Sequence, residues 1–161
     1  MLNNDIIRCT RKALYLNDSV ATAIFKLVGH STNPEELKKL MIKEGEPGFE
    51  PAPAPLVSSF LDGLIIYKRG PKPGSAGKPQ PAKSKLTNND VLKKIRIALE
   101  IHEDTMLEIF NAGEKPVTAS ELTALFRKPG HKHYKECGDQ YMRAFFRGLS
   151  SYVSDSKSAH N

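Results

Sequence analysis

Hydrophobic positions recur at spacings of three and four residues along most of the chain, as on one face of an α-helix. In residues 88–99, for example, Val91, Ile95 and Leu99 share one side of such a helix, directly after the polar start Asn88-Asn89-Asp90. No segment shows the apolar and polar alternation with β-branched enrichment that is typical of strands. The pattern therefore predicts an all-α protein.

The same helical pattern occurs twice. When the sequence is shifted by 85 positions, residues 3–67 align with residues 88–152 without a gap, and 17 positions are identical. The identical pairs include Asn3 and Asn88, Asn4 and Asn89, Asp5 and Asp90, Arg11 and Arg96, Phe25 and Phe110, Phe60 and Phe145, Gly63 and Gly148, and Tyr67 and Tyr152. Identities in a single register indicate a tandem duplication.

Each copy is predicted to contain four helices. The third begins at a capping box in both copies, at Asn33-Pro34-Glu35-Glu36 and at Thr118-Ala119-Ser120-Glu121. The second is expected over residues 18–28 and 103–112, and the fourth carries the apolar residues between 56 and 64 and between 141 and 149. Gly63 and Gly148 interrupt the fourth pattern, where glycine costs about 1 kcal/mol relative to alanine, so a close helix contact is expected there.

These boundaries divide the chain into a first helical repeat (residues 1–69), a basic linker rich in Pro, Gly and Lys (70–85), a second helical repeat (86–153) and a disordered tail (154–161). A unit of about 65 residues buries too little surface to be stable alone, so the two copies should pack on each other. We expect two tandem four-helix units packed with pseudo-twofold symmetry.

The net charge of +6 lies in the linker. Residues 1–67 carry 7 basic and 8 acidic side chains, residues 86–161 carry 11 and 10, and residues 68–85 carry six basic and no acidic ones. The helical units are thus nearly neutral. The sequence has no long apolar run and no signal segment at its start, which favours a cytoplasmic protein without a membrane partner, and its two cysteines do not suggest a disulfide framework.

The Asn-Asn-Asp openings, Arg11 and Arg96, the segment from Phe60 to Gly70 and the segment from Leu125 to Gln140 resemble a family of small bacterial cytoplasmic proteins of the YehS type. The resemblance covers both copies. It implies two copies of a domain of unknown function and brings no catalytic residues.

The candidate contact site is a basic turn that precedes the fourth helix of the second copy. It consists of Arg127, Lys128, His131, Lys132, His133 and Lys135. A helix N-terminus offers free N–H groups and a positive dipole end, so the turn and the helix together are predicted to hold an anion or a partner. The alternative is a solvated basic turn. In the first copy, residues 43–50 are acidic at the same place, so attraction between the two turns is a further alternative.

Other readings of these residues are structural. His131, His133 and Cys137 lack a nearby fourth metal ligand, and Cys137 has no visible base to make it a nucleophile. The linker segment 74–78 does not match a phosphate-binding loop. Arg11 and Arg96 should form structural ion pairs, and the matched aromatics Phe49 and Tyr134, and Tyr67 and Tyr152, should pack in the core or between the copies.

The sequence therefore predicts no catalytic, cofactor or metal site. We expect a non-enzymatic interaction or adaptor module with a protein partner and leave its oligomeric state open. The alternative is a nucleic-acid-binding regulatory protein that contacts phosphates through the linker and residues 127–135.

Overall fold

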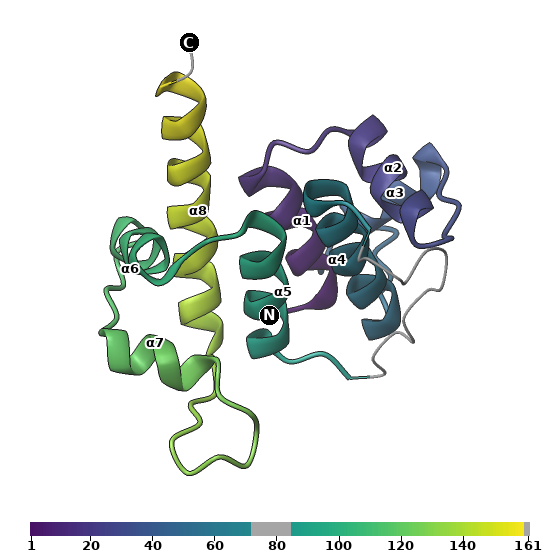
Figure 1. Ribbon diagram of the computed structural model, residues 1–161. Helices are drawn as coiled ribbons and strands as arrows, with labels where there is room; N and C mark the ends of the chain where they lie inside the picture. The colour runs from purple at the N-terminus through teal and green to yellow at the C-terminus, as the bar shows by residue number, and fades with distance from the viewer. Residues whose placement is uncertain (72–84, 160–161) are drawn as a thin grey trace.

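The computed structural model describes residues 1–71 and 85–159, which form eight α-helices and no strand (Figure 1). The helices are α1 (Asn3–Ala13), α2 (Asp18–Leu27), α3 (Pro34–Leu40), α4 (Ala54–Arg69), α5 (Asn88–Leu99), α6 (Glu103–Ala112), α7 (Ala119–Leu125) and α8 (Asp139–Ala159). The all-α prediction with two tandem sets of helices is confirmed. Most of the predicted linker, residues 72–84, lies outside the described residues.

The predicted helix starts are present. The side chain of Asn33 accepts a hydrogen bond from the Glu36 N–H at the start of α3, and the side chain of Thr118 accepts one from the Glu121 N–H at the start of α7. Each contact satisfies a backbone donor that has no partner within the helix. The full capping box forms at α7, where the Glu121 side chain also accepts the Thr118 N–H, whereas at α3 the described contacts give only the half made by Asn33.

The two glycines in the fourth helix of each copy allow a close crossing of helices. A Cβ at Gly63 would lie 2.4 Å from the Ile24 carbonyl oxygen, and a Cβ at Gly148 would lie 1.8 Å from the Ile109 carbonyl oxygen. The second helix of each copy therefore packs directly on the backbone of the fourth, as the glycine positions predicted.

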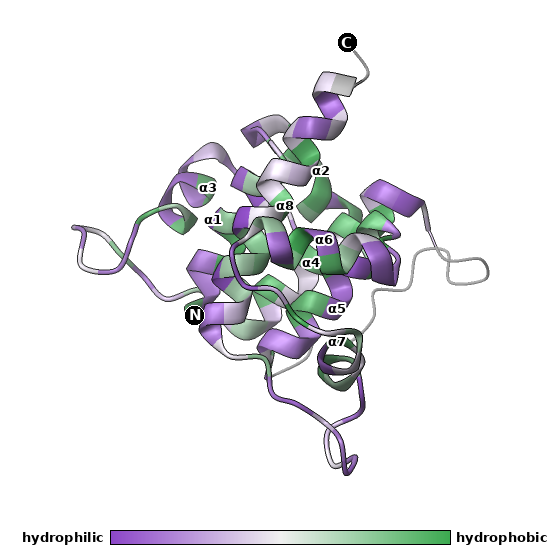
Figure 2. Ribbon diagram, turned by 90° about the vertical axis from the view of Figure 1, so that its left-hand side faces the viewer, coloured by the Kyte–Doolittle hydropathy of each residue, from purple (hydrophilic) through white to green (hydrophobic). Residues whose placement is uncertain are grey.

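The two copies pack reciprocally: α4 of the first copy lies against α5 of the second, and α8 of the second lies against α1 of the first. Figure 2 shows hydrophobic positions on the helices of the bundle, whereas the connecting segments are mainly hydrophilic. The largest fully buried side chains include the repeat-matched phenylalanines Phe25, Phe60, Phe110 and Phe145. The copies are therefore packed together, as expected, and their pseudo-twofold relation stays a prediction.

Two details differ from the sequence-based expectations. Tyr67 and Tyr152 are 43% and 39% exposed rather than packed in the core. The helix α8 continues through residues 154–159, where a disordered tail was expected. Near its end, Lys157 Nζ lies 4.2 Å from the centre of the Tyr15 ring, so this part of α8 contacts the first copy.

The matched arginines have a shared role and a divergent one. The Nε atoms of Arg11 and Arg96 donate to the carbonyl oxygens of Leu16 and Ile101, respectively, and so hold the turn after the first helix of each copy. Arg11 also forms the expected ion pair, with Asp18 at 2.6 Å. The guanidinium of Arg96 instead lies 4.6 Å from the centre of the Phe126 ring, so the predicted ion pair is replaced by a cation–π contact.

Candidate partner-binding groove

An open groove of about 530 Å³ runs between α7 and the turn formed by residues 127–135. In Figure 1 this turn is the long loop below α7 that leads into α8. The groove is lined by Ala119, Ser120, Glu121, Thr123, Ala124, Arg127, His133, Tyr134 and Lys135. The small side chains of α7 form its floor, and the cationic and aromatic side chains of the turn form the opposite wall.

Asn89 holds the turn in place from α5. Its side-chain amide donates to the carbonyl oxygens of Leu125 and Lys135, at 2.9 and 2.8 Å, and its carbonyl oxygen accepts from the Cys137 N–H at 2.9 Å. Asn4, the matched residue of the first copy, bonds in the same manner to Glu50 and Ala52. Asn89 therefore fixes both ends of its turn and Asn4 fixes the second end of the matching turn, which explains why a buried polar side chain occurs at this position in both copies.

Backbone contacts shape the turn itself. Gly130 has φ of +93°, a conformation that favours glycine, and the His131 N–H donates to the Lys128 carbonyl oxygen at 3.0 Å. The His133 N–H donates to His131 Nδ1 at 3.0 Å, and the Lys135 N–H donates to the Ala124 carbonyl oxygen at 3.0 Å. These bonds keep the wall of the groove beside α7.

The six predicted contact residues divide into two sets. Arg127, His133 and Lys135 line the groove, whereas Lys128, His131 and Lys132 lie on the exposed outside of the same turn. Within the described part of the chain, none of the ion pairs found involves a cation of this turn. The cations of the turn are therefore exposed or line the groove outside the ion pairs described above, and the carboxylate of Glu121 acts on Lys135 only through space.

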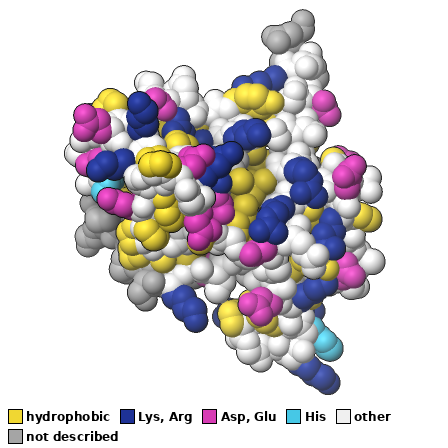
Figure 3. Space-filling view, turned by 180° about the vertical axis from the view of Figure 1, so that it is seen from behind, with side chains coloured by type: hydrophobic (Ala, Val, Ile, Leu, Met, Phe, Trp, Pro, Cys, Tyr) yellow, Lys and Arg dark blue, Asp and Glu magenta, His cyan; other side chains and the backbone are white. Residues whose placement is uncertain are grey.

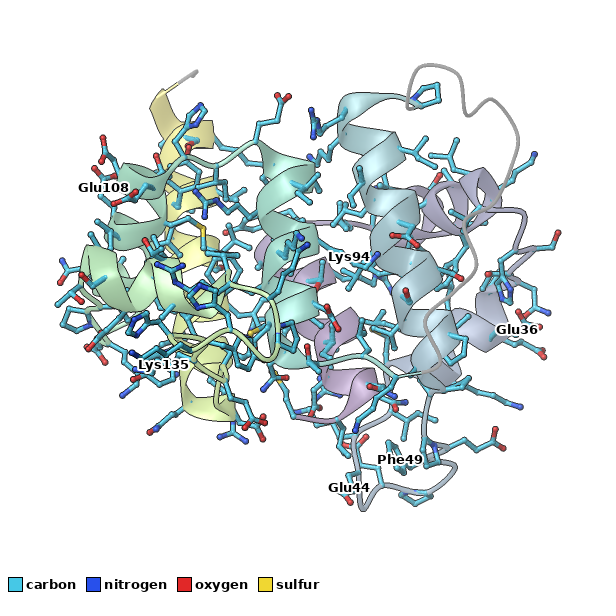
Figure 4. The ribbon with its side chains drawn as sticks, turned by 60° about the horizontal axis from the view of Figure 1, so that its bottom comes forward. Glu36, Glu44, Phe49, Lys94, Glu108 and Lys135 are labelled. Atoms are coloured by element: carbon cyan, nitrogen blue, oxygen red, sulfur yellow. The ribbon has the colours of Figure 1, made fainter. Side chains whose placement is uncertain are left out.

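Lys135 connects the groove with α8 (Figure 4). Its Nζ donates to the Tyr141 hydroxyl at 3.1 Å and lies 4.8 Å from the centre of that ring, and Lys115 Nζ approaches the same ring at 4.6 Å. The hydrogen bond to Tyr141 raises the pKa of Lys135, and desolvation raises the pKa of Tyr134. Both groups therefore stay protonated at neutral pH, with Lys135 charged and Tyr134 neutral.

The N-terminus of α8 does not take part in this groove, which corrects the predicted geometry. Asp139, its first residue, forms an ion pair with the amino group of Met1 and accepts from Asn88 Nδ2 at 2.9 Å. The hydrogen bond from the Met1 amino group and the one from Asn88 lower the pKa of Asp139. The first residue of α8 is thus held by Met1 and Asn88, and no residue of α8 lines the groove.

Cys137 lies inside the fold with 2% of its surface exposed. Burial raises the pKa of its thiol to about 12, so the thiol is protonated and unreactive at neutral pH. His131 and His133 are exposed on the turn. Across residues 1–71 and 85–159, no group of three or more His, Cys, Asp or Glu side chains is placed to hold a metal ion.

The floor of the groove could not be found from sequence. Ala119, Ser120 and Ala124 are unremarkable residues of a short amphipathic helix, and their role follows from the turn that folds over them. The acidic turn of the first copy, marked by Glu44 and Phe49 in Figure 4, lies on a different part of the molecule from Lys135. Among the described ion pairs, none joins the two turns, so the fold gives no support to attraction between them within one chain.

Comparison with known proteins agrees with two tandem copies of one unit. The model of the family described as "Protein of unknown function (DUF1456)" matches residues 3–70 and 88–153, which are the two copies of the repeat. This chain belongs to that family. It is 41% identical over 151 residues to the "Uncharacterized protein YehS" of Escherichia coli (strain K12), an alignment that covers 94% of this chain and 96% of that relative. The resemblance inferred from the sequence is confirmed.

No solved structure gives a significant match. Within the described residues, no helix has the length and apolar character needed to cross a membrane.

Proposed function

We propose that this protein is a non-enzymatic cytoplasmic interaction module that binds an acidic segment of a partner protein in the groove between α7 and residues 127–135. The observation that carries the proposal is the combination of an open groove with a small-residue floor and a cationic wall. Such a groove admits an extended peptide backbone on the floor and places carboxylates beside Arg127, His133 and Lys135.

One carboxylate, that of Glu121, lines the groove together with the cations. Glu121 Oε2 accepts the Thr118 N–H at 3.2 Å and completes the capping box of α7, where its charge complements the helix dipole. Its charge also contributes to the raised pKa of Lys135. Because Arg127 and Lys135 outnumber this one carboxylate, the wall keeps an excess of positive charge for carboxylates from outside.

The titratable groups of the groove favour binding over catalysis. The wall carries protonated Lys135 and Tyr134, and the nearby Cys137 thiol is buried with a raised pKa. None of these pairs a nucleophile with a base within the groove. Binding of charge complementary to the wall is the chemistry that this arrangement supports best.

Fluorescence anisotropy with a labelled octaglutamate peptide tests the proposal. The test variant is R127Q/K135Q, which removes the Arg and Lys charges that line the groove, and the control is K38Q/K39Q, which removes the same charge from exposed lysines of α3 in the first copy. Because exposed ion pairs each contribute about 0.2–1 kcal/mol, the test variant should bind about 2- to 30-fold more weakly. The control should bind like the unmodified protein.

Amide chemical-shift mapping with the same peptide locates the contact. The proposal expects perturbations in residues 119–127 and 133–135. Equal loss of affinity in the two variants would show attraction to net charge alone and would contradict a binding groove. Tighter binding of a labelled single-stranded oligonucleotide at the same residues would instead assign this groove to nucleic acid.

A further inference from the structure

A second cationic surface crosses the seam where the two copies meet at α1 and α8. It consists of Arg8 and Lys12 on α1 and of Arg143, Arg147 and Lys157 on α8, and we call it the α1–α8 band. Figure 3 shows several Lys and Arg side chains on this side of the molecule, with hydrophobic side chains and some Asp and Glu side chains among them. It shares no residue with the groove.

Helical spacing and packing bring these cations together. Arg8 and Lys12 are four residues apart, as are Arg143 and Arg147, so each pair occupies one stripe of its helix. Cys9, on α1, is close enough to both pairs to be affected by their charge. Burial is the main cause of the raised pKa of its thiol, whereas Arg8, Lys12 and Arg143 each lower that pKa. Charges from both copies therefore converge on one point of the seam.

The fold neutralises only part of this charge. Arg8 is paired with Asp5, and Arg147 donates to the neutral carbonyl oxygen of Gly113 at 2.8 Å. Lys12, Arg143 and Lys157 are exposed and take part in none of the ion pairs found among the described residues. On α8, Arg143 follows Asp139 by four residues and acts on its carboxylate, whereas Arg143 and Arg147 are like charges at the same spacing, which disfavours a helix.

The matching seam between α4 and α5 is built differently. There, Lys94 is paired with Asp62, and Arg69 is paired with Glu100 at 3.2 Å. Asp62 corresponds in the repeat to Arg147, so the same position carries a carboxylate at one seam and a guanidinium at the other. The duplication has thus produced one seam closed by ion pairs and one seam with excess positive charge.

We propose that the α1–α8 band binds the phosphate backbone of a nucleic acid. From Arg143 to Lys157 the band follows α8 for about 21 Å, a length suited to a ligand with regularly repeated charges. Arg143 and Arg147 on α8 provide planar donors for phosphate oxygens. Tyr15, which is 51% exposed and lies beside Lys157, offers a ring on which a base can stack. The contacts are to phosphate, so binding is expected to be largely independent of sequence.

The test is the salt dependence of binding to labelled 20-mers of single-stranded DNA, single-stranded RNA and duplex DNA, with the full-length protein. The variant K12Q/R143Q/K157Q removes the three exposed cations that take part in none of the ion pairs and hydrogen bonds described above, and it leaves the contacts of Arg8 and Arg147 in place. The control K38Q/K39Q/K93Q removes equal charge from exposed lysines outside the band.

If the three cations each contact a phosphate, the variant should lose about 2 from the slope of log K against log salt for a single strand. Between 50 and 200 mM salt, the affinity of the unmodified protein should then fall about 16-fold more than that of the variant. The control should keep the full slope. The comparison of the three oligonucleotides shows which form of the backbone fits the band.

Equal slopes for the band variant and the control would overturn the proposal, as would tighter binding of octaglutamate than of any oligonucleotide at the band. The two proposals fail separately. The groove variant R127Q/K135Q should retain nucleic-acid binding, and the band variant should retain binding of octaglutamate.

Discussion

Replacing Gly148 with alanine tests the close crossing of α6 and α8. The added Cβ would lie 1.8 Å from the Ile109 carbonyl oxygen and 2.7 Å from the Ile109 carbonyl carbon. Because both are backbone atoms, no side chain can rotate away, and the helices must separate by about 1.2 Å to reach even the shortest contacts that real Cβ atoms make. Overpacking of this kind costs about 1–3 kcal/mol, against which the better helix propensity of alanine returns at most about 1 kcal/mol.

We therefore expect G148A to lose about 2 kcal/mol of unfolding free energy, which corresponds to about 4–8 °C in Tm for a chain of this size. G63A should lose less, because its Cβ would lie 2.4 Å from the Ile24 carbonyl oxygen. Urea unfolding followed by circular dichroism measures both values. The control is S151A at an exposed position of α8, which should be neutral or slightly stabilising. A G148A protein as stable as S151A would refute the reasoning.

Three further experiments, two with substitutions and one with a thiol reagent, probe the residues that hold the groove and the contact between the copies. N89A leaves two carbonyl oxygens and one N–H without their partner and should cost about 2–4 kcal/mol in urea unfolding, whereas N111A at an exposed site should have little effect. Burial raises the pKa of the Cys137 thiol to about 12 and also raises the pKa of the Cys9 thiol. At pH 8 both thiols should therefore react with a disulfide reagent more slowly in the native than in the unfolded protein, and Cys137 should be the slower of the two. Fast labelling of Cys137 in the native protein would contradict its burial. The pKa of Asp139 is lower in the folded than in the unfolded chain, so its contribution to stability is present above about pH 4 and is lost as the pH falls through the folded pKa. The D139N variant should lose this acid-dependent part of the unfolding free energy. If D139N and the unmodified protein have the same dependence of stability on pH between pH 2 and 5, the role given to Asp139 is wrong.

Most of the fold was predictable because the duplication provides two readings of each helix. The starts of α3 and α7 could be recognised from the capping boxes at Asn33 and Thr118, and Gly63 and Gly148 marked the close crossings. The end of α8 was missed, since its last residues are polar and carry no apolar period; they remain helical as an extension of a long packed helix.

The candidate sites were less accessible to sequence reasoning. The cations of residues 127–135 were visible as a cluster, but the floor of the groove depends on how the turn folds over Ala119 and Ala124. The α1–α8 band was hidden, because net charge is summed along the chain whereas the band combines Lys12 of the first copy with Arg143 of the second. Nearly neutral copies can therefore still present a strongly basic face.

Differential scanning calorimetry of the full-length protein and of G148A tests most directly whether the two copies form one interlocked bundle. Reciprocal packing of α4 on α5 and of α8 on α1 predicts a single transition whose calorimetric and van't Hoff enthalpies agree, and the substitution in the second copy should lower the whole transition. Two transitions, with G148A shifting only one of them, would contradict the account.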